Sequence, residues 1–246
     1  MLPITKVYKA GILQCKKTFI QTPQGLKAFL SHSPDNIAFH AGGDCKNPAF
    51  RDSILHNRQK LIMPFSITQL VYLNQIHGTK ILHANCGGFL GDGDGMIITK
   101  SNIIGLIMVA DCNPILLFDK KQQILTLLHA GRAGVQGGIL KIALQTLQKD
   151  FHTNLQDLFV YCGPSIRACC YEVKEDVFGD DSLNCGKILR EGKIYLDLIA
   201  ILKAQLESFG ILNYEISPLC TCCEDSYFSY RRNLHCGRFG LFAYLV

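Results

Sequence analysis

The chain alternates short apolar runs with polar turns, and this pattern predicts a series of β-strands. The polar stretch from Asp119 to Gln122 predicts a turn between two neighbouring strands. The segments that we expect to be strands are, in chain order, Asn36 to Ala41, Gln69 to Ile76, Met96 to Thr99, Ile103 to Ala110, Ile115 to Asp119, Ile124 to His129, Phe159 to Cys162, Leu212 to Ile216 and Phe239 to Val246.

Two other segments have apolar residues three and four positions apart, which is the spacing of an amphipathic helix. The first runs from about Val135 to Lys149. The second runs from Leu196 to Phe209, and Gly210 is placed to end it. We find no linker, low-complexity stretch or internal repeat. The sequence therefore predicts one domain over residues 1–246, of the α+β (mixed α/β) class, with mixed β-sheets flanked by helices.

The composition allows a sizeable apolar core, because 48% of the 246 residues are hydrophobic. The net charge of +5 is mild, and no dense basic run indicates a nucleic-acid partner. The longest apolar run, Ile103 to Ala110, is too short to cross a bilayer, and Met1 to Lys6 lacks the apolar region of a signal peptide. We therefore expect a cytoplasmic protein without a membrane partner, and the sequence does not indicate an oligomeric state.

The 12 cysteines form neither a secreted disulfide framework nor a zinc finger. Cys169-Cys170 and Cys222-Cys223 are adjacent pairs, and the segment from Cys220 to Cys223 has no second ligand pair at finger spacing. We expect most of the cysteines to be small buried hydrophobic residues in a reducing compartment.

Three predicted strands end at, or next to, a reactive side chain that is followed by a turn residue. These side chains are His77 before Gly78, Cys112 near Pro114, and His129 near Gly131. Two imidazoles and one thiolate could hold a zinc ion and leave its fourth position open for water. Taken singly, each has a plainer interpretation as a hydrogen-bonded structural histidine or a buried cysteine.

The turn after His129 suggests an anion site. Gly131, Gly134, Gly137 and Gly138 free the backbone near the start of a predicted helix, where exposed amides bind phosphate, and Arg132 adds a cation. The alternative is that these glycines only allow the helix to pack closely on the sheet.

These residues carry a resemblance to a known family. The segments Asn74 to Lys80, Asp94 to Asp119, His129 to Gly138, Gly163 to Val173 and Phe228 to Arg238 resemble the YfiH-like family. That family has been described both as multicopper polyphenol oxidases (laccases) and as purine nucleoside phosphorylases with adenosine deaminase activity. The most specific matches are Gln75-Ile76-His77-Gly78, Ala110-Asp111-Cys112-Asn113-Pro114, Gly163-Pro164-Ser165-Ile166, Cys169-Cys170-Tyr171-Glu172-Val173 and Ser229-Tyr230-Arg231-Arg232.

The resemblance implies a fold similar to the toxin-type cysteine hydrolases, with zinc bound by His77, Cys112 and His129, or with copper as the alternative ion. It also implies purine nucleoside and phosphate as substrates. The chain departs from the family where it has His129-Ala130-Gly131-Arg132-Ala133-Gly134. The family has His-Ala-Gly-Trp-Arg-Gly there, so the arginine lies one position early.

For deamination of adenosine, zinc would activate a water molecule, and Asp111 is the local carboxylate that could move a proton. Cys112 and His129 would then take part in catalysis as metal ligands. For phosphorolysis, Arg58, Arg132 and the backbone at Gly131 are candidates to bind phosphate. Arg231 and Arg232 could also serve, although paired arginines near a C-terminus commonly form structural ion pairs.

Two other functions remain as alternatives. In a Cys-His hydrolase, Cys112 would be the nucleophile and His129 the base, and the substrate would be an amide or a peptidoglycan precursor. A multicopper oxidase is disfavoured, because the 8 histidines include no His-x-His pair to hold a copper cluster.

Overall fold

Two six-stranded sheets form the centre of the described protein. The computed structural model describes residues 16–65, 67, 69–179 and 181–246, so Met1 to Lys6 lies outside it. The first sheet has the order β1 (Lys17–Phe19), β2 (Leu26–Ser31), β15 (Phe239–Leu245), β7 (Ile103–Val109), β3 (Gln69–Asn74) and β5 (Gly88–Asp92). The second has the order β14 (Glu215–Ile216), β10 (Phe159–Cys162), β8 (Asn113–Asp119), β9 (Ile124–Ala130), β6 (Gly95–Ile98) and β4 (Ile81–Ala84).

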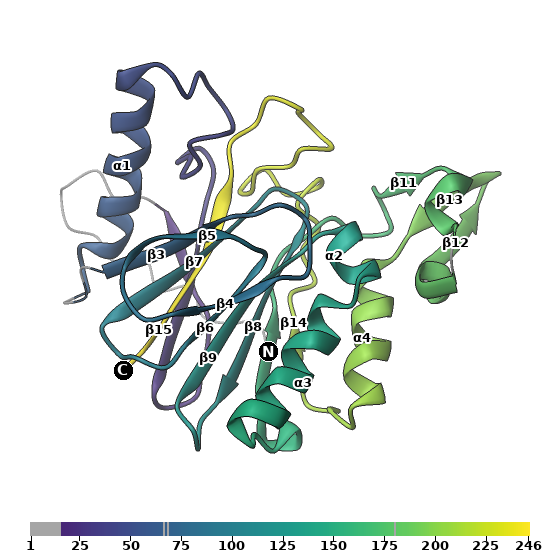
Figure 1. Ribbon diagram of the computed structural model, residues 1–246. Coiled ribbons are helices and arrows are strands. Elements are labelled where there is room, and N and C mark those ends of the chain that lie inside the picture. The colour runs from purple at the N-terminus through teal and green to yellow at the C-terminus, as the bar shows by residue number, and fades with distance from the viewer. Residues whose placement is uncertain (1–15, 66, 68, 180) are drawn as a thin grey trace.

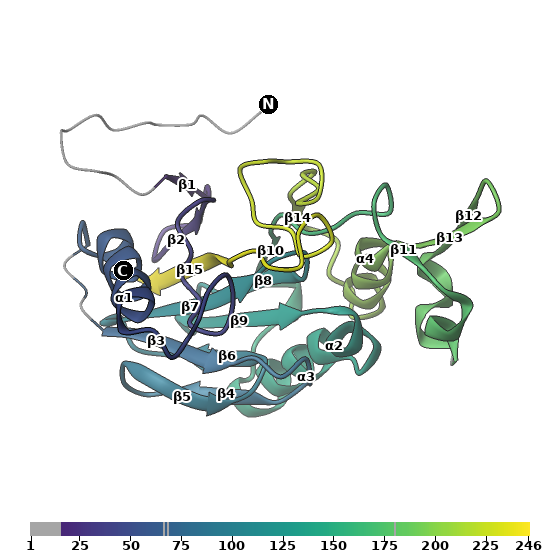
Figure 2. The ribbon, with the colours of Figure 1, turned by 90° about the horizontal axis from the view of Figure 1, so that it is seen from above.

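Helices cover the outer faces of both sheets (Figure 1). The helix α1 (Pro48–Ile62) covers the first sheet, whereas α2 (Arg132–Gln136), α3 (Ile139–Phe151) and α4 (Leu198–Ser208) cover the second. A small third sheet, β11 (Glu172–Val173), β13 (Lys193–Leu196) and β12 (Lys187–Arg190), extends beyond α4, as both ribbon views show (Figure 2). Short 3-10 helices complete the described elements at Leu155–Asp157, Glu175–Phe178 and Asp181–Gly186.

Both faces of the central strands are buried, and this explains their continuous apolar runs. In β7, Ile107 and Val109 point into the core between the two sheets, and Leu106 and Met108 point into the core under α1. The strand β9 alternates in the same way between the core of the two sheets and the core under α2, α3 and α4. Gly105 lets the two sheets approach closely, because a Cβ there would lie 2.6 Å from a methyl group of Leu127.

The predicted α+β class with mixed sheets flanked by helices is confirmed, as are the strands around residues 69–74, 96–98, 103–109, 115–119, 124–129, 159–162 and 239–245. Of the strand predicted over Leu212 to Ile216, only β14 (Glu215–Ile216) forms. The prediction of a strand over Asn36 to Ala41 is wrong. The Asn36 side chain accepts from the Ala38 amide and donates to the Ala41 carbonyl, so local side-chain bonds replace a strand ladder there.

The helices also differ from the prediction. The first predicted helix is two helices, because Gly138 has a φ of +77° and breaks the segment between α2 and α3. The second corresponds to α4, and Gly210 follows it with a left-handed φ of +72°. The pattern missed α1, which buries only Ile54, Arg58 and Leu61 and so lacks a clear apolar stripe. No helix in the described ranges has both the length and the apolar character needed to span a bilayer.

The prediction that most cysteines are buried is wrong for the described residues. Cys162, Cys220 and Cys236 are buried, and the others are partly or fully exposed at Cys45, Cys86, Cys112, Cys169, Cys170, Cys185, Cys222 and Cys223. The described cysteines are all free thiols.

Candidate metal centre and substrate pocket

The candidate site lies at the rim where the chain passes from one central sheet to the other. His77 follows β3 of the first sheet, and His129 belongs to β9 of the second. Cys112 stands in the connection from β7 to β8, which crosses between the sheets. The Gln75 side chain continues the pairing of β3 with β7, because it donates to the Met108 carbonyl at 2.7 Å and accepts from the Met108 amide at 2.8 Å.

This arrangement brings His77, Cys112 and His129 together. One ligand atom from each lies within 4.8 Å of the others. The sulfur of Cys112 is 3.9 Å from Nε2 of His77, and the two imidazole rings meet edge to face with centroids 4.8 Å apart. His129 is buried, Cys112 is partly buried and His77 is exposed, so the group opens toward solvent on one side.

The buried carboxylate of Asp94 fixes both histidines. One oxygen accepts from Nδ1 of His129 at 2.7 Å and from the His77 amide at 2.9 Å. The other oxygen accepts from the amides of Gly78 at 2.7 Å and Ile76 at 3.3 Å. Three successive amides therefore surround one anion, and this cradle includes the left-handed φ of +61° at His77. With Nδ1 bonded to Asp94, His129 presents Nε2 to the site.

The charges within the group favour a thiolate. Burial alone would raise the pKa of the Cys112 thiol, but the charge and hydrogen bond of His129, with those of His77, lower this pKa from 9.0 to about 6. Burial opposes protonation of His129, yet the Cys112 charge and the hydrogen bond to Asp94 raise the pKa of His129 to about 9. Without a metal, both pKa shifts favour the thiolate–imidazolium form of the pair.

The donor set fits a metal ion with one open coordination position. Two imidazole nitrogens and one thiolate are typical ligands of catalytic zinc. Asp94 behind His129 supplies the carboxylate that commonly orients a metal-binding histidine. Gly131 leaves the necessary room, because a Cβ there would lie 2.9 Å from the Cys112 sulfur and 3.1 Å from the His77 ring. His77, Cys112 and His129 would therefore hold the ion.

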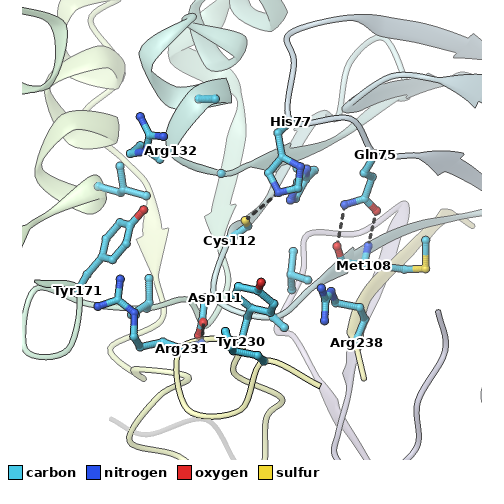
Figure 3. Close-up of a pocket in the computed structure, with 18 of the residues that line it drawn as sticks. Gln75, His77, Met108, Asp111, Cys112, Arg132, Tyr171, Tyr230, Arg231 and Arg238 are labelled. Carbon is cyan, nitrogen blue, oxygen red and sulfur yellow. Dashed lines mark hydrogen bonds between the residues drawn. The ribbon is translucent and has the colours of Figure 1, made fainter. Parts of the chain in front are cut away.

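A cavity of about 750 Å³ lies in front of this group. That volume is within the range of small-molecule sites. Figure 3 shows the side chains of Arg132, Tyr171 and Arg231 on one side of the space in front of Cys112, with Tyr230 and Arg238 on another. Arginines outnumber the single acidic lining residue, Asp111, so the cavity is cationic and suits an anionic ligand.

Asp111 lines this cavity, but its carboxylate is occupied by the C-terminal loop. One oxygen accepts from the Thr221 hydroxyl at 2.7 Å, and the other accepts from the Arg231 amide at 2.7 Å. Its backbone has a left-handed φ of +97°. The structure thus places the predicted proton carrier in an anchoring position beside Cys112.

Arg58 is not brought to this cavity. It lies on the buried face of α1, donates from Nε to the Ile37 carbonyl at 2.7 Å, and stacks on Phe39 and Tyr72. Arg132 does line the cavity, and Gly131 precedes it as the N-cap of α2. Because α2 covers only Arg132–Gln136, it offers a single helical turn of amides.

Of the paired arginines, Arg231 lines the cavity, whereas Arg232 donates to backbone carbonyls of its own loop. Sequence reasoning gave no role to Asp94, Tyr171, Tyr230 or Arg238. Asp94 could have been singled out, because it directly precedes an apolar strand, and a carboxylate buried there needs hydrogen-bond donors around it. The other three stand in loops, where hydrophobic periodicity carries no information.

Among the described residues, the groups able to hold a metal ion are this one and a cluster of cysteines. The remaining histidines at positions 32, 40, 56, 83, 152 and 235 join neither group. Of these histidines, His40 lines the same cavity as His77 and His129.

The chain matches one family model and is similar to proteins that share one name. A family model described as multi-copper polyphenol oxidoreductase laccase matches residues 33–246. The purine nucleoside phosphorylase of Clostridium acetobutylicum is 33% identical over 175 residues, which cover 69% of this chain and 73% of that protein. The purine nucleoside phosphorylase of Borreliella burgdorferi is 35% identical over 173 residues, or 67% of this chain and 74% of that protein.

Solved structures share the fold. YlmD from Geobacillus stearothermophilus superposes with a TM-score of 0.82 at 26% identity, covering 90% of this chain and 92% of its own. The hypothetical protein YfiH of Bacillus licheniformis gives a TM-score of 0.81 at 23% identity, over 90% of this chain and 93% of its own.

Proposed function

The chain belongs to the family described as multi-copper polyphenol oxidoreductase laccase, and we propose that this member is a purine nucleoside phosphorylase with a zinc-binding site. The names of its relatives support phosphorolysis. The observation that carries the proposal is that three arginines share one cavity with the His77–Cys112–His129 group. A cationic cavity beside a metal-type donor set suits a phosphate and a nucleoside together.

Phosphate binding falls to the arginines. Arg132, Arg231 and Arg238 line the cavity, and charge-assisted hydrogen bonds from guanidinium groups are strong ones for phosphate. Arg231 and Arg238 each donate from Nη1 to backbone carbonyls as well, so their other guanidinium N–H groups would contact phosphate. Arg58 is left out of this set, because its guanidinium is committed to the Ile37 carbonyl and to two aromatic rings.

The purine fits the aromatic part of the lining. Tyr171 and Tyr230 offer ring faces, and Ile166 and Leu234 add apolar surface. Burial raises the pKa of the Tyr171 hydroxyl, so that this group stays protonated and can donate a hydrogen bond to a purine nitrogen.

In the reaction, an oxygen of phosphate forms a bond to C1′ of the ribose. The bond from C1′ to the purine nitrogen breaks, its electron pair stays with the base, and the base gains the proton that hydrogen phosphate gives up. The arginines place the phosphate, and Tyr171 stabilises the leaving base. The products are ribose 1-phosphate and the free purine.

Deamination of adenosine is the second activity that we propose for the same site. It is favoured by the donor set, which has only three protein ligands and faces the cavity. A zinc ion, when bound, would supply a Lewis acid and a water molecule with a pKa of about 7. The chain's own contribution is to hold Nδ1 of His129 on Asp94, which leaves Nε2 directed at the ion.

The thiolate–imidazolium pair of Cys112 and His129 favours one different function, a Cys-His hydrolase of amide bonds. The two functions respond to zinc in opposite ways. Zinc bound to Cys112 would block a nucleophilic thiolate, whereas it would support the nucleoside activities.

The test is to incubate the full chain with adenosine, inosine or guanosine, with and without phosphate, and to separate the products. We expect free purine and ribose 1-phosphate only when phosphate is present, and inosine from adenosine when zinc is loaded. Absence of purine release from all three nucleosides would refute the phosphorylase. Amide hydrolysis by the metal-free protein that a thiol-alkylating reagent abolishes would establish the hydrolase instead.

Arginine variants test the phosphate site. We expect Arg132→Ala and Arg238→Ala each to raise KM for phosphate by about ten-fold or more, the worth of one charge-assisted hydrogen bond. Arg51→Ala is the matched control, because Arg51 is exposed on α1 away from the cavity lining. Equal phosphate KM in all three variants would remove the arginines from the proposed site.

A further inference from the structure

Four cysteine side chains from two distant segments meet outside the His77–Cys112–His129 group. Their sulfur atoms all lie within 4.8 Å of one another. We propose that Cys169, Cys170, Cys220 and Cys223 bind one structural zinc ion through four thiolates. This four-cysteine site shares no ligand with the candidate catalytic centre, and it stands whether or not the proposed nucleoside activity is correct.

Two of the sulfur separations lie close to those of a tetrahedral site. Zinc–sulfur bonds of about 2.3 Å place the sulfurs of a tetrahedron roughly 3.8 Å apart. Here the Cys223 sulfur is 3.3 Å from that of Cys170 and 3.9 Å from that of Cys169. A disulfide needs about 2.05 Å between its sulfurs, so these thiols are spaced for a shared ion and not bonded to each other.

Two backbone turns pre-form the site. In the first, the amides of Cys170 and Tyr171 both donate to the Arg167 carbonyl at 2.9 Å. In the second, the amides of Cys223 and Glu224 both donate to the Cys220 carbonyl at 3.0 Å. Each turn folds two nearby cysteines toward one point, and this lets the adjacent Cys169 and Cys170 serve together.

The two turns are joined to each other independently of any metal. Ser165 and Cys220 form a parallel β-bridge, and the Thr221 amide donates to the Ser165 carbonyl at 3.1 Å. A site whose backbone is already fixed loses little conformational entropy when the ion binds. Cys169 and Cys223 are exposed, so an ion can enter from solvent.

Cations stand where a four-thiolate zinc site needs them. Zinc with four thiolates carries a net charge of −2. Arg231 donates from Nη1 to the carbonyls of Cys170 at 3.2 Å and Glu172 at 2.9 Å, and Arg232 donates to the Thr221 carbonyl at 2.8 Å and the Cys222 carbonyl at 3.1 Å. The two guanidinium groups thus lie against both cysteine turns and offset that charge.

Four protein ligands leave no open position, which is the pattern of a structural zinc ion. The ion would tie the loop that ends at Tyr171 to the loop that contains Arg231. Both of these residues line the substrate cavity. The four-cysteine site would therefore hold two walls of the cavity together.

The test is zinc content of the full chain, reconstituted with zinc under reducing conditions and freed of loosely bound ions. We expect two zinc ions per chain in the unaltered protein, and one in the Cys169→Ser/Cys223→Ser double variant. The His77→Ala variant, which damages the other centre, should keep the zinc at the four-cysteine site. Cys185→Ser is the matched control, because Cys185 is an exposed free thiol outside the cluster, and it should keep both ions.

The ligand set is read directly in the His77→Ala variant, in which all four cysteines are intact. X-ray absorption of its zinc should show only sulfur, at about 2.3 Å. Cobalt in place of zinc should give the sulfur-to-metal charge-transfer bands of a tetrahedral thiolate site. These measurements decide the question even if the double cysteine variant fails to fold. The proposal is overturned if the His77→Ala variant binds no zinc, if nitrogen or oxygen ligands appear, or if mass analysis finds these cysteines joined as disulfides after reduction and refolding with zinc.

Discussion

Replacing Asp94 by asparagine tests how the candidate metal centre is built. The carboxylate accepts four hydrogen bonds, two at each oxygen, and all four donors belong to residues 76–78 and 129. Asparagine keeps one acceptor oxygen and puts an NH₂ group in place of the other. Two of the four donors then face another donor inside a buried site.

The magnitude follows from those contacts. Two charge-assisted hydrogen bonds are lost, each worth about 1.5–3 kcal/mol, so we expect the free energy of unfolding to fall by about 3 kcal/mol or more. For a chain of this size, about 3 kcal/mol corresponds to a fall in Tm of roughly 6–12 °C. Loss of the carboxylate behind His129 should also weaken zinc binding by about 10–100-fold.

The pKa of Asp94 determines how this loss of stability depends on pH. Burial raises the pKa of Asp94, but the hydrogen bonds from His129, Gly78 and His77 outweigh it, and the pKa lies below its ordinary value of 3.8. A carboxyl with a lowered pKa in the folded state stabilises the protein above its unfolded pKa, and this contribution is lost as pH falls through the folded pKa. The stability difference between the two proteins should therefore be full at neutral pH and shrink only below about pH 4.

The assay is thermal unfolding of metal-free protein from pH 3 to pH 8, with zinc affinity measured by competition against a chromophoric chelator. Asp92→Asn is the matched control, because Asp92 is exposed two positions away and bonds only to the Asn74 side chain among the described contacts. If Asp94→Asn matched Asp92→Asn in both Tm and zinc affinity, the Asp94 cradle would not organise the site.

Three further variants or reactions probe the same geometry. Gly131→Ala would place a Cβ 2.9 Å from the Cys112 sulfur, so zinc affinity should fall at least about ten-fold while the circular dichroism spectrum stays the same. An unchanged zinc affinity would contradict this geometry. In metal-free protein, iodoacetamide should modify Cys112 with a pH midpoint of about 6, and zinc should block the reaction. Peptide mass analysis measures the modification, with Cys112→Ser as the blank, and a midpoint near 9 would show that His129 has no influence on this thiol. Arg58→Ala should lower stability by about 1–3 kcal/mol, because the Ile37 carbonyl loses its donor, while KM for phosphate stays the same; a raised KM would return Arg58 to the phosphate site.

Much of the fold could be predicted from apolar periodicity, because the central strands are buried on both faces. The runs that became β7, β8 and β9 are apolar at most of their buried positions, and Thr126 in β9 is a polar exception. Elements with a weak apolar face escaped the prediction. The helix α1 puts Arg58 at one of its three buried positions, so its pattern looks polar although Asn47 and Pro48 mark its start.

The candidate site could be predicted in part for a different reason. His77, Cys112 and His129 each follow or end a strand, and strand ends at one rim of a sandwich lie close together. Their convergence depends on pairing between strands far apart in the chain, which local sequence does not encode. The four-cysteine site could not be predicted from local sequence for the same reason, because Cys170 and Cys223 are 53 residues apart and their spacing is not that of a zinc finger.

Asp111 connects the candidate metal centre to the loop that carries half of the four-cysteine site. It stands next to Cys112 in the connection between the sheets, and its carboxylate accepts from Thr221 and from the Arg231 amide. Thr221 follows a ligand of the four-cysteine site, and Arg231 donates to the Cys170 carbonyl. A carboxylate held from both sides by the C-terminal loop is poorly placed to move protons at the metal centre, but well placed to set the position of that loop against Cys112. We therefore interpret Asp111 as a residue that positions the C-terminal loop beside Cys112, and its role in proton transfer stays a prediction.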